Sequence, residues 1–436
     1  MTSSAAELYA RDRVVAGVEK LRFFPLAVES GHGCWLTEPG GRRLLDLSAT
    51  WTAAGLGHGH PAVVDAAHRA ISRPAGAGGL SAVHPDSVGL AEDLLALTPG
   101  DPDRRVYLGH AGTDANDVAL RCARFATGKR RVIAFEHSYH GGLGVAMGVS
   151  GVHIDAGSVA STPDTVFLPY PNPYRAADPQ REVAAVLQAV ERECSQDDVA
   201  CLIVEPILSD GGLVVPPPGF LAELTQLCRR LDVLTICDEV KVGLGRPGTL
   251  HAFERDGATP DLVTFGKALG AGLPISAAVG PAAVLDQPVA SALLTTAGNP
   301  VCTAVARAVL DVLVKEGLAQ RAAEAGRRLR SGLAEATAGL ECVGDIRGPG
   351  LVIGVELVQD RQSKTPAPDL AAQVVYRLWE LGAVCYYVGG NVLEVTPPLV
   401  IADDEVDVAV ELLTRAIDDA QSGRVDAEAV KEFAGW

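Results

Sequence analysis

Short apolar runs alternate with helix-like segments through the middle of the chain. Residues 131–135, 199–204 and 234–237 are apolar runs bounded by polar residues, a pattern typical of strands buried on both faces of a mainly parallel sheet. Between the last two runs, residues 220–231 place their apolar side chains on one helical face. Such strand–helix–strand repetition predicts an α/β core whose ligand site lies at the carboxyl ends of the strands.

A second pattern begins after about residue 300 and predicts a smaller α/β domain. Its segments are a helical stretch at 304–340 broken near Gly317, a strand at 351–357, a helix at 370–381, a strand at 384–387 and a final helix at 405–417. We therefore expect a large domain at residues 51–298 and a small domain at 299–436. The N-terminal segment, 1–50, contains a hairpin-like stretch at 34–47 that is expected to pack with the small domain.

Composition excludes several classes of function. The net charge of −17 argues against nucleic acid as a partner, because phosphates require a basic surface. Apolar residues make up 48% of the chain and charged residues 21%, which is ordinary for a globular protein with large cores. The nine cysteines are scattered without metal-ligand spacing, so we expect free thiols, no metal site and a reducing, cytoplasmic location.

One uncharged stretch, residues 268–285, is long enough to be mistaken for a membrane span. Several glycines and prolines interrupt it, so a loop followed by a short strand at 275–279 is the better interpretation. The N-terminus lacks a basic segment followed by an apolar core, so neither a signal peptide nor a membrane partner is expected.

An acid and a lysine end two successive strand-like runs. Asp238 follows the run at 234–237, and Lys267 follows residues 261–266. An enzyme that uses pyridoxal 5'-phosphate (PLP) needs this pair, because the lysine amine forms a Schiff base with the cofactor and the acid pairs with the pyridinium nitrogen. The pair predicts chemistry at an amino group and its α-carbon.

Three neighbouring motifs allow two interpretations each. Gly112 and Thr113 lie between a strand and a helix, where they could hold a phosphate; the alternative is a plain helix cap by Thr113 or Asp114. Tyr139 could stack on one face of a planar cofactor while Val240 packs on the other, or it could simply pack in the core. Residues 243–248 match G-x-G-x-x-G, but the proline in this motif favours a loop over a dinucleotide site.

The motifs in this order resemble those of the class III aminotransferase family of fold-type-I PLP enzymes. The similarity covers nearly the whole chain and rests on LGHGHP at 56–61, YHG at 139–141, EP at 205–206, DEV at 238–240, GK at 266–267 and GNP at 298–300. It implies an aspartate aminotransferase-like α/β fold, with a mainly parallel seven-stranded sheet in the large domain. Enzymes of this fold bind PLP.

One branch of the family is more similar than the others, namely the α-amino-ε-caprolactam racemases. The matching segments are KLRFFPL at 20–26, SDGG at 209–212, DEVKVG at 238–243, YYVG at 386–389, NVLE at 391–394 and FAGW at 433–436. Isoleucine 2-epimerase is a more distant relative on the same branch.

The resemblance implies a role for each candidate residue. Lys267 bonds the cofactor, Asp238 pairs with the pyridine nitrogen, Gly112 and Thr113 hold the phosphate, Tyr139 stacks on the ring with Val240 opposite, Asp210 is an acid/base, and Trp51 and Lys241 lie near the substrate. Thr295 matches a threonine that reaches the phosphate of the partner subunit. A homodimer with its active sites at the interface is therefore expected.

Two observations favour racemisation over amino transfer. Inversion is simplest with two bases on opposite faces of the α-carbon, and Asp210 can join Lys267, although Asp-Gly-Gly is also an ordinary turn signal. Many family aminotransferases carry a carboxylate-binding arginine three residues before a Pro-Pro pair, whereas this chain has Glu394. A glutamate would repel a carboxylate, which suggests a substrate whose carboxyl group is masked, as in an amide or lactam.

The sequence therefore predicts a racemase of α-amino lactams or amino acid amides. The alternatives are a class III aminotransferase, a 2-epimerase of free apolar amino acids, and a PLP-binding protein without catalytic function.

Overall fold

The computed structural model describes residues 4–73, 79–160 and 162–433, and its largest element is a seven-stranded sheet. In spatial order the strands are β4 (Arg104–Gly109), β10 (Ser276–Pro281), β9 (Leu262–Phe265), β8 (Leu234–Asp238), β7 (Val199–Val204), β5 (Arg131–Phe135) and β6 (Thr165–Leu168). Only β10 runs antiparallel to its neighbours, so the predicted mainly parallel sheet is confirmed.

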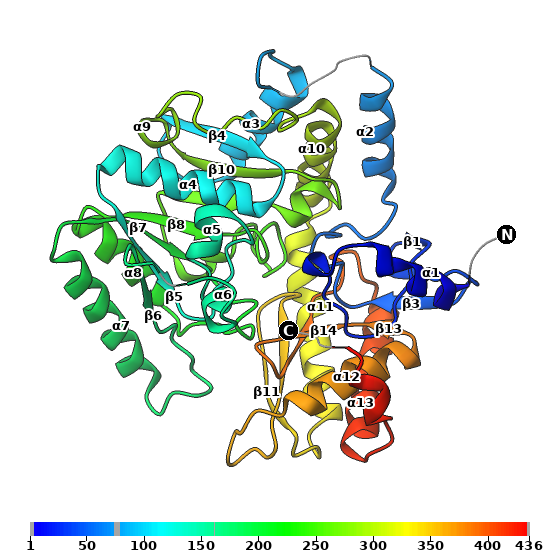
Figure 1. Ribbon diagram of the computed structural model, residues 1–436. Coiled ribbons are helices and arrows are strands. Elements are labelled where there is room, and N and C mark those ends of the chain that lie inside the picture. Colours follow the sequence, from blue (N-terminus) through cyan, green and yellow to red (C-terminus); the bar gives the residue numbers. More distant parts are fainter. Residues whose placement is uncertain (1–3, 74–78, 161, 434–436) are drawn as a thin grey trace.

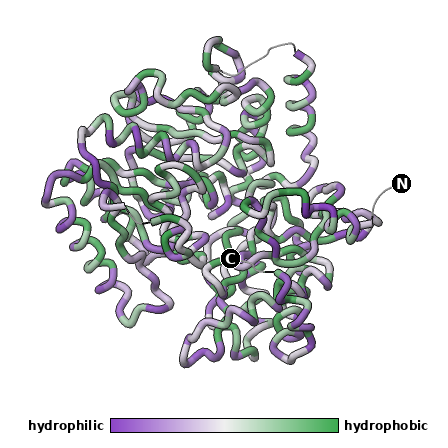
Figure 2. The backbone as a smooth tube through the Cα atoms, in the orientation of Figure 1, coloured by the Kyte–Doolittle hydropathy of each residue, from purple (hydrophilic) through white to green (hydrophobic). Residues whose placement is uncertain are grey.

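Helices cover this sheet and make its central strands fully buried. Every residue of β7 is buried, because one face packs on α4 (Gly112–Thr127) and the other lies toward α8 (Phe220–Arg230). The remaining helices of this part are α2 (Pro61–Ile71), α3 (Pro85–Leu97), α5 (Gly144–Gly148), α6 (Gly151–Asp155), α7 (Pro179–Cys194) and α9 (Ala282–Leu285). Figure 2 shows hydrophobic residues concentrated along the inner strands and hydrophilic ones on the outer turns.

Two smaller sheets form the second part of the molecule (Figure 1). One contains β11 (Val343–Arg347), β12 (Ile353–Leu357), β15 (Val392–Val395) and β14 (Tyr386–Val388), all antiparallel. The other contains β1 (Ser30–His32), β2 (Trp35–Thr37), β3 (Arg43–Asp46) and β13 (Ala383–Val384). Since β3 pairs in parallel with β13, the N-terminal hairpin lies beside the C-terminal part of the chain.

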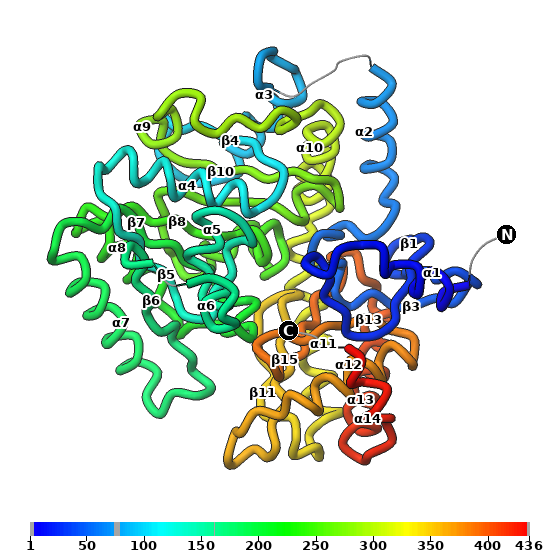
Figure 3. The backbone as a smooth tube through the Cα atoms, viewed as in Figure 1, coloured from blue at the N-terminus to red at the C-terminus, as the bar shows by residue number. Residues whose placement is uncertain are grey.

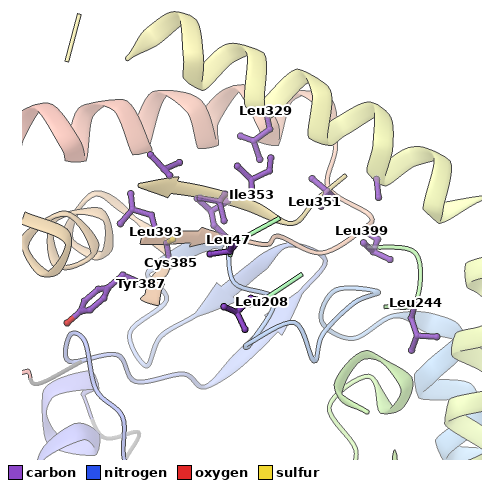
Figure 4. Close-up of a cluster of buried hydrophobic side chains, with 14 of the residues drawn as sticks. Leu47, Leu208, Leu244, Leu329, Leu351, Ile353, Cys385, Tyr387, Leu393 and Leu399 are labelled. Atoms are coloured by element: carbon purple, nitrogen blue, oxygen red, sulfur yellow. The ribbon is translucent and has the colours of Figure 1, made fainter. Parts of the chain in front are cut away.

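Long helices accompany these sheets. α11 (Leu318–Ala336) and α12 (Pro368–Leu381) pack on the strands, α13 (Asp403–Gln421) packs on both of these helices, and α10 (Pro300–Lys315) packs on α2 and α3. Figure 3 traces the chain from α10, beside α2 and α3, to α11, beside the small sheets. Figure 4 shows side chains from distant segments meeting in one core, with Leu329 of α11 above Ile353 of β12, and Leu47 and Cys385 nearby.

Several expected elements have different bounds in the structure. Residues 384–387 are not one strand, because the chain changes sheets at the fully buried Cys385, between β13 and β14. The helix at 405–417 is longer, as α13, and is not the last, since α14 (Ala427–Val430) follows. The break near Gly317 is confirmed, with φ +61° at this glycine. The last residues of the FAGW segment, 434–436, lie outside the described residues.

Two other expectations agree with the structure. Residues 243–248 form turns, with positive φ at Gly245 and Gly248, and contain no helix start. The segment 268–285 contains a loop that is followed by β10 and α9. No helix within the described ranges is long and apolar enough to cross a membrane, and all nine cysteines, which fall in those ranges, are free thiols.

Candidate active site

Asp238 and Lys267 lie at the same edge of the large sheet. Asp238 is the last residue of β8, and Lys267 follows the adjacent parallel strand β9 after one glycine. Both line a cavity of about 350 Å³. The carboxyl ends of parallel strands meet at one edge of a sheet, which explains how residues distant in the sequence share this cavity.

A buried network holds the Asp238 carboxylate. Its Oδ2 accepts hydrogen bonds from Asn116 Nδ2 (2.7 Å) and pairs with His140 Nδ1 (2.8 Å), while Oδ1 accepts from the Val240 N–H (3.0 Å). Thr264 Oγ1 in turn donates to Asn116 Oδ1 (2.7 Å). The sequence motifs assigned no role to Asn116 and included His140 only within YHG at 139–141. Their position next to the acid depends on tertiary contacts.

The start of α4 forms a tight backbone cradle. Gly112 and Thr113 are the first two residues of this helix, where N–H groups have no acceptor within the helix. A Cβ atom at Gly112 would lie 2.5 Å from Val240 Cγ1, so only glycine fits there. Asp114 accepts from the N–H groups of His110 (2.7 Å) and Ala111 (3.1 Å). Asp114 therefore binds the N–H groups that precede the helix, and a helix start of this kind suits an anion.

Lys267 has an unusual backbone conformation and a lowered pKa. Its φ of +42° is rare for a residue other than glycine, and such conformations concentrate at functional sites. Burial lowers the pKa of Lys267, and the nearby Lys241 ammonium lowers it further. A lowered pKa increases the fraction of neutral amine, which is the form that attacks a carbonyl.

Asp210, Lys241 and Glu394 form a buried ionic group. Lys241 Nζ lies 2.6 Å from Asp210 Oδ1 and 3.0 Å from Glu394 Oε1. The exposed fraction of the side chain is 5% for Lys241, 7% for Asp210 and 2% for Glu394. Burial raises the pKa of both carboxyls. At Asp210 the Lys241 and Lys267 cations together outweigh burial and lower the pKa, whereas at Glu394 the pKa stays raised. Asp210 and Lys241 line the same cavity as Lys267.

Trp51 lies over this ionic group. Lys241 Nζ is 5.1 Å from the centre of its ring, and the ring stacks on Tyr386 at 4.6 Å. Residues 49–52 all have positive φ, between 47° and 67°, although none is glycine. A left-handed turn costs about 1–2 kcal/mol per residue, so the surrounding contacts hold Trp51 at an energetic cost.

The other predicted residues divide into two groups. Tyr139 and Val240 line the cavity, and the Tyr139 N–H donates to Glu205 Oε1 at 2.9 Å. Thr295 is exposed and is not among the residues that line the cavity within one chain. A larger cavity of about 730 Å³ lies between α2, α3 and α10 and contains none of the predicted site residues.

Residues 16–417 match the sequence profile of the family described as Aminotransferase class-III, and the chain belongs to this family. It is therefore a PLP-dependent enzyme of fold type I. The residues present fit this cofactor, because the glycine cradle at α4, the anchored Asp238 and the buried Lys267 lie around one cavity.

Curated relatives include both racemases and aminotransferases. The chain is 33% identical to an alanine/serine racemase of Pyrococcus horikoshii, over 98% of this chain and 93% of the relative. It is 32% identical to an isoleucine 2-epimerase of Lentilactobacillus buchneri, over 96% and 95%. A 4-aminobutyrate aminotransferase of Mycobacterium leprae is also 32% identical, over 91% of both chains.

Solved structures of similar fold include a thermostable (S)-enantioselective omega-transaminase from Thermomicrobium roseum. The TM-score is 0.89 and the identity 29%, over 96% of this chain and 100% of that one. Enzymes of this family act on small amino compounds and are typically dimers.

Proposed function

We propose that this enzyme is a PLP-dependent racemase that inverts the α-carbon of α-amino lactams or amino acid amides. The racemase and epimerase relatives support an isomerase, while related aminotransferases leave amino transfer as the second candidate. The observation that carries the proposal is the buried group of Asp210, Lys241 and Glu394 beside Lys267.

The cofactor has a clear set of candidate ligands. Gly112 and Thr113 would hold the phosphate at the start of α4, Asp238 would pair with the pyridine nitrogen, and Tyr139 and Val240 would enclose the ring. When bound, PLP withdraws electrons from the α-carbon of an attached amino compound and so makes its α-proton acidic. Thr295 would complete the phosphate site of the partner subunit in a homodimer.

Two bases in one cavity support inversion. The Lys267 amine would take or return the α-proton on one face, and Asp210 would do so on the other. Because the Lys241 and Lys267 cations outweigh burial and lower the pKa of Asp210, this side chain is ionised, the form that a base requires. One inversion leaves one base protonated and the other deprotonated, and exchange with solvent restores both.

The charge around Glu394 supports a substrate without a free carboxylate. Within the described residues, the cavity lining contains two lysines and no arginine. Lys241 is already paired with two acids, and Lys267 bonds the cofactor. The nearby Arg246 is buried, its Nη1 donates to the carbonyls of Leu351, Thr396 and Pro397, and it is not among the residues that line the cavity, so we do not assign it the role of the missing arginine. An amide or lactam needs no such cation.

Proton exchange distinguishes the candidate reactions. We would incubate the enzyme in deuterated water with a panel of amino amides, lactams and free amino acids, without any keto acid, and follow them by NMR. A racemase incorporates deuterium at the α-carbon and abolishes optical rotation. Keto product in an amount equal to the enzyme would instead show an aminotransferase half-reaction.

Membership of this enzyme family disfavours the third alternative, a PLP-binding protein without catalytic function. That alternative predicts no turnover of any compound on the panel. Turnover that disappears in Lys267→Ala, with the fold preserved by circular dichroism, would exclude it. We also infer a cytoplasmic location, which the free thiols support.

A further inference from the structure

Asp210 lies in a short hairpin between β7 and α8. The N–H groups of Leu208 and Val214 each donate to the other residue's carbonyl, at 3.0 and 2.9 Å. Within this loop, the N–H groups of Gly212 and Leu213 donate to the carbonyl of Ser209. The hairpin, residues 208–214, is therefore a compact unit, and its position determines where the Asp210 carboxylate lies.

The large domain holds one side of the hairpin. Glu205 Oε2 accepts from both the N–H (3.0 Å) and the Oγ (2.5 Å) of Ser209. A Cβ atom at Gly211 would lie 2.7 Å from the carbonyl oxygen of His137, so the backbones are in direct contact. These contacts anchor the N-terminal half of the hairpin.

The small domain holds the other side. The Gly389 N–H donates to the carbonyl of Asp210 itself, at 3.0 Å. Arg347 of β11 binds two later carbonyls of the hairpin, since its Nη2 donates to the carbonyl of Gly212 (2.5 Å) and its Nε to that of Leu213 (2.9 Å). A Cβ atom at Gly389 would lie 2.9 Å from Gly212 Cα, so this contact also requires glycine.

Acidic side chains keep Arg347 in place. Its Nη1 pairs with Glu356 Oε2 at 2.6 Å and with Asp345 Oδ2 at 3.0 Å, and its side chain is 11% exposed. Glu356, in β12, is also paired with Arg175, which belongs to the large domain. Because Asp345 and Glu356 fix the Arg347 guanidinium, it cannot easily move together with the hairpin.

We propose that Arg347 and Gly389 are positioning residues, and that the small domain sets the position of Asp210 through them. This inference rests on the proposed two-base racemisation. Lys267 follows β9 of the large sheet, and none of the contacts described above involves it. Loosening the small-domain contacts therefore withdraws Asp210 from the α-carbon while Lys267 stays in place.

Isotope exchange separates the two bases. In deuterated water, one substrate enantiomer can exchange its α-proton through Lys267 with retention, whereas inversion also needs Asp210. We would measure both rates, and the absorbance of the cofactor, in the holoenzyme of Arg347→Gln, Arg347→Lys and Gly389→Ala. Asp210→Asn is the reference for a lost base. Arg361→Gln is the matched control, because Arg361 also binds small-domain carbonyls (Val343, Thr337 and Leu340) but none in the hairpin.

Amide hydrogen exchange of residues 206–216, with and without cofactor, reports the hairpin independently of activity. We expect faster exchange there in Arg347→Gln and Gly389→Ala, and inversion reduced by about 10- to 100-fold, the effect of a displacement of about 1 Å. Exchange with retention should change less than about 2-fold in these variants, as should both rates in Arg361→Gln. Inversion should be less reduced in Arg347→Lys than in Arg347→Gln, because a lysine keeps the positive charge but cannot bind two carbonyls at once as the guanidinium does.

Any of four results would overturn the inference. If inversion and retention fall together in Arg347→Gln, or if the hairpin exchanges as in the wild type, the contacts are merely structural. Normal inversion in Asp210→Asn would refute the two-base function itself, and the positioning role with it. If only Asp210→Asn loses inversion, the proposed function stands, but the small domain does not set the position of Asp210.

Discussion

Lys241 Nζ lies 2.6 Å from Asp210 Oδ1, and both side chains are almost fully buried. Glu394 is the second partner of the same ammonium, at 3.0 Å. Removing one partner from a buried ionic group leaves an uncompensated charge, which is more costly than losing a surface pair. Since Asp210 and Glu394 share one ammonium, the charge on Asp210 depends on a residue of the small domain, Glu394.

The first prediction concerns Asp210→Asn. The substitution keeps the size of the side chain, and Lys241 retains Glu394 as a partner, so the fold should survive. Inversion should fall by about 10²- to 10⁴-fold, the usual contribution of a general acid or base. The absorbance of the bound cofactor should stay unchanged, because Asp238 and Lys267 are untouched. Unchanged racemisation, measured by polarimetry, would contradict the assignment.

The second prediction concerns the pH dependence of cofactor binding in Lys241→Gln. Capture of PLP by the apoenzyme needs a neutral Lys267 amine, so its rate rises with pH through the pKa of Lys267. Burial first, and then the Lys241 ammonium, lower this pKa. Removing the ammonium raises it, so the rate profile should move to higher pH. Stopped-flow absorbance across a pH series measures the shift, and a shift to lower pH would refute the electrostatic role.

The third prediction concerns substrate selectivity in Glu394→Gln. The substitution removes a buried acid beside Lys241, which lines the cavity, so repulsion of a free carboxylate there should decrease. We expect kcat/KM for free amino acids, relative to their amides, to rise by about 10-fold, equivalent to about 1.4 kcal/mol. Glu38→Gln is a suitable control, since Glu38 is equally buried but pairs with Arg42 at the N-terminal sheet. The same ratio in both variants would argue against a role for Glu394 in selectivity.

The fourth prediction concerns the left-handed turn that carries Trp51. Thr50 is exposed and β-branched and has φ +53°, a strained combination. Thr50→Asn should stabilise the protein by about 0.5–1 kcal/mol, because asparagine tolerates this conformation better. Thr365→Asn, an exposed position without positive φ, should give no gain. Urea denaturation of both variants measures the difference, and equal stability of both would contradict the strain.

The candidate site was only partly predictable from the sequence. Local patterns identified Asp238 and Lys267, because each follows a buried strand and the strand ends converge on one edge. Asn116 and His140 gave no comparable signal, since their contact with Asp238 requires a helix and a loop to fold onto the sheet. Glu394 was expected only to repel a carboxylate, whereas in the structure it pairs with Lys241.

The sequence by itself determined the class of fold, the cofactor and the lysine that bonds it, because periodicity and short motifs are local properties of the chain. Only the tertiary structure decided how the small domain contributes. It placed Lys241 between Asp210 and Glu394, brought Arg347 and Gly389 to the Asp210 hairpin, and divided residues 384–387 between two sheets. Each of these depends on pairing between segments far apart in the sequence, which no local pattern encodes.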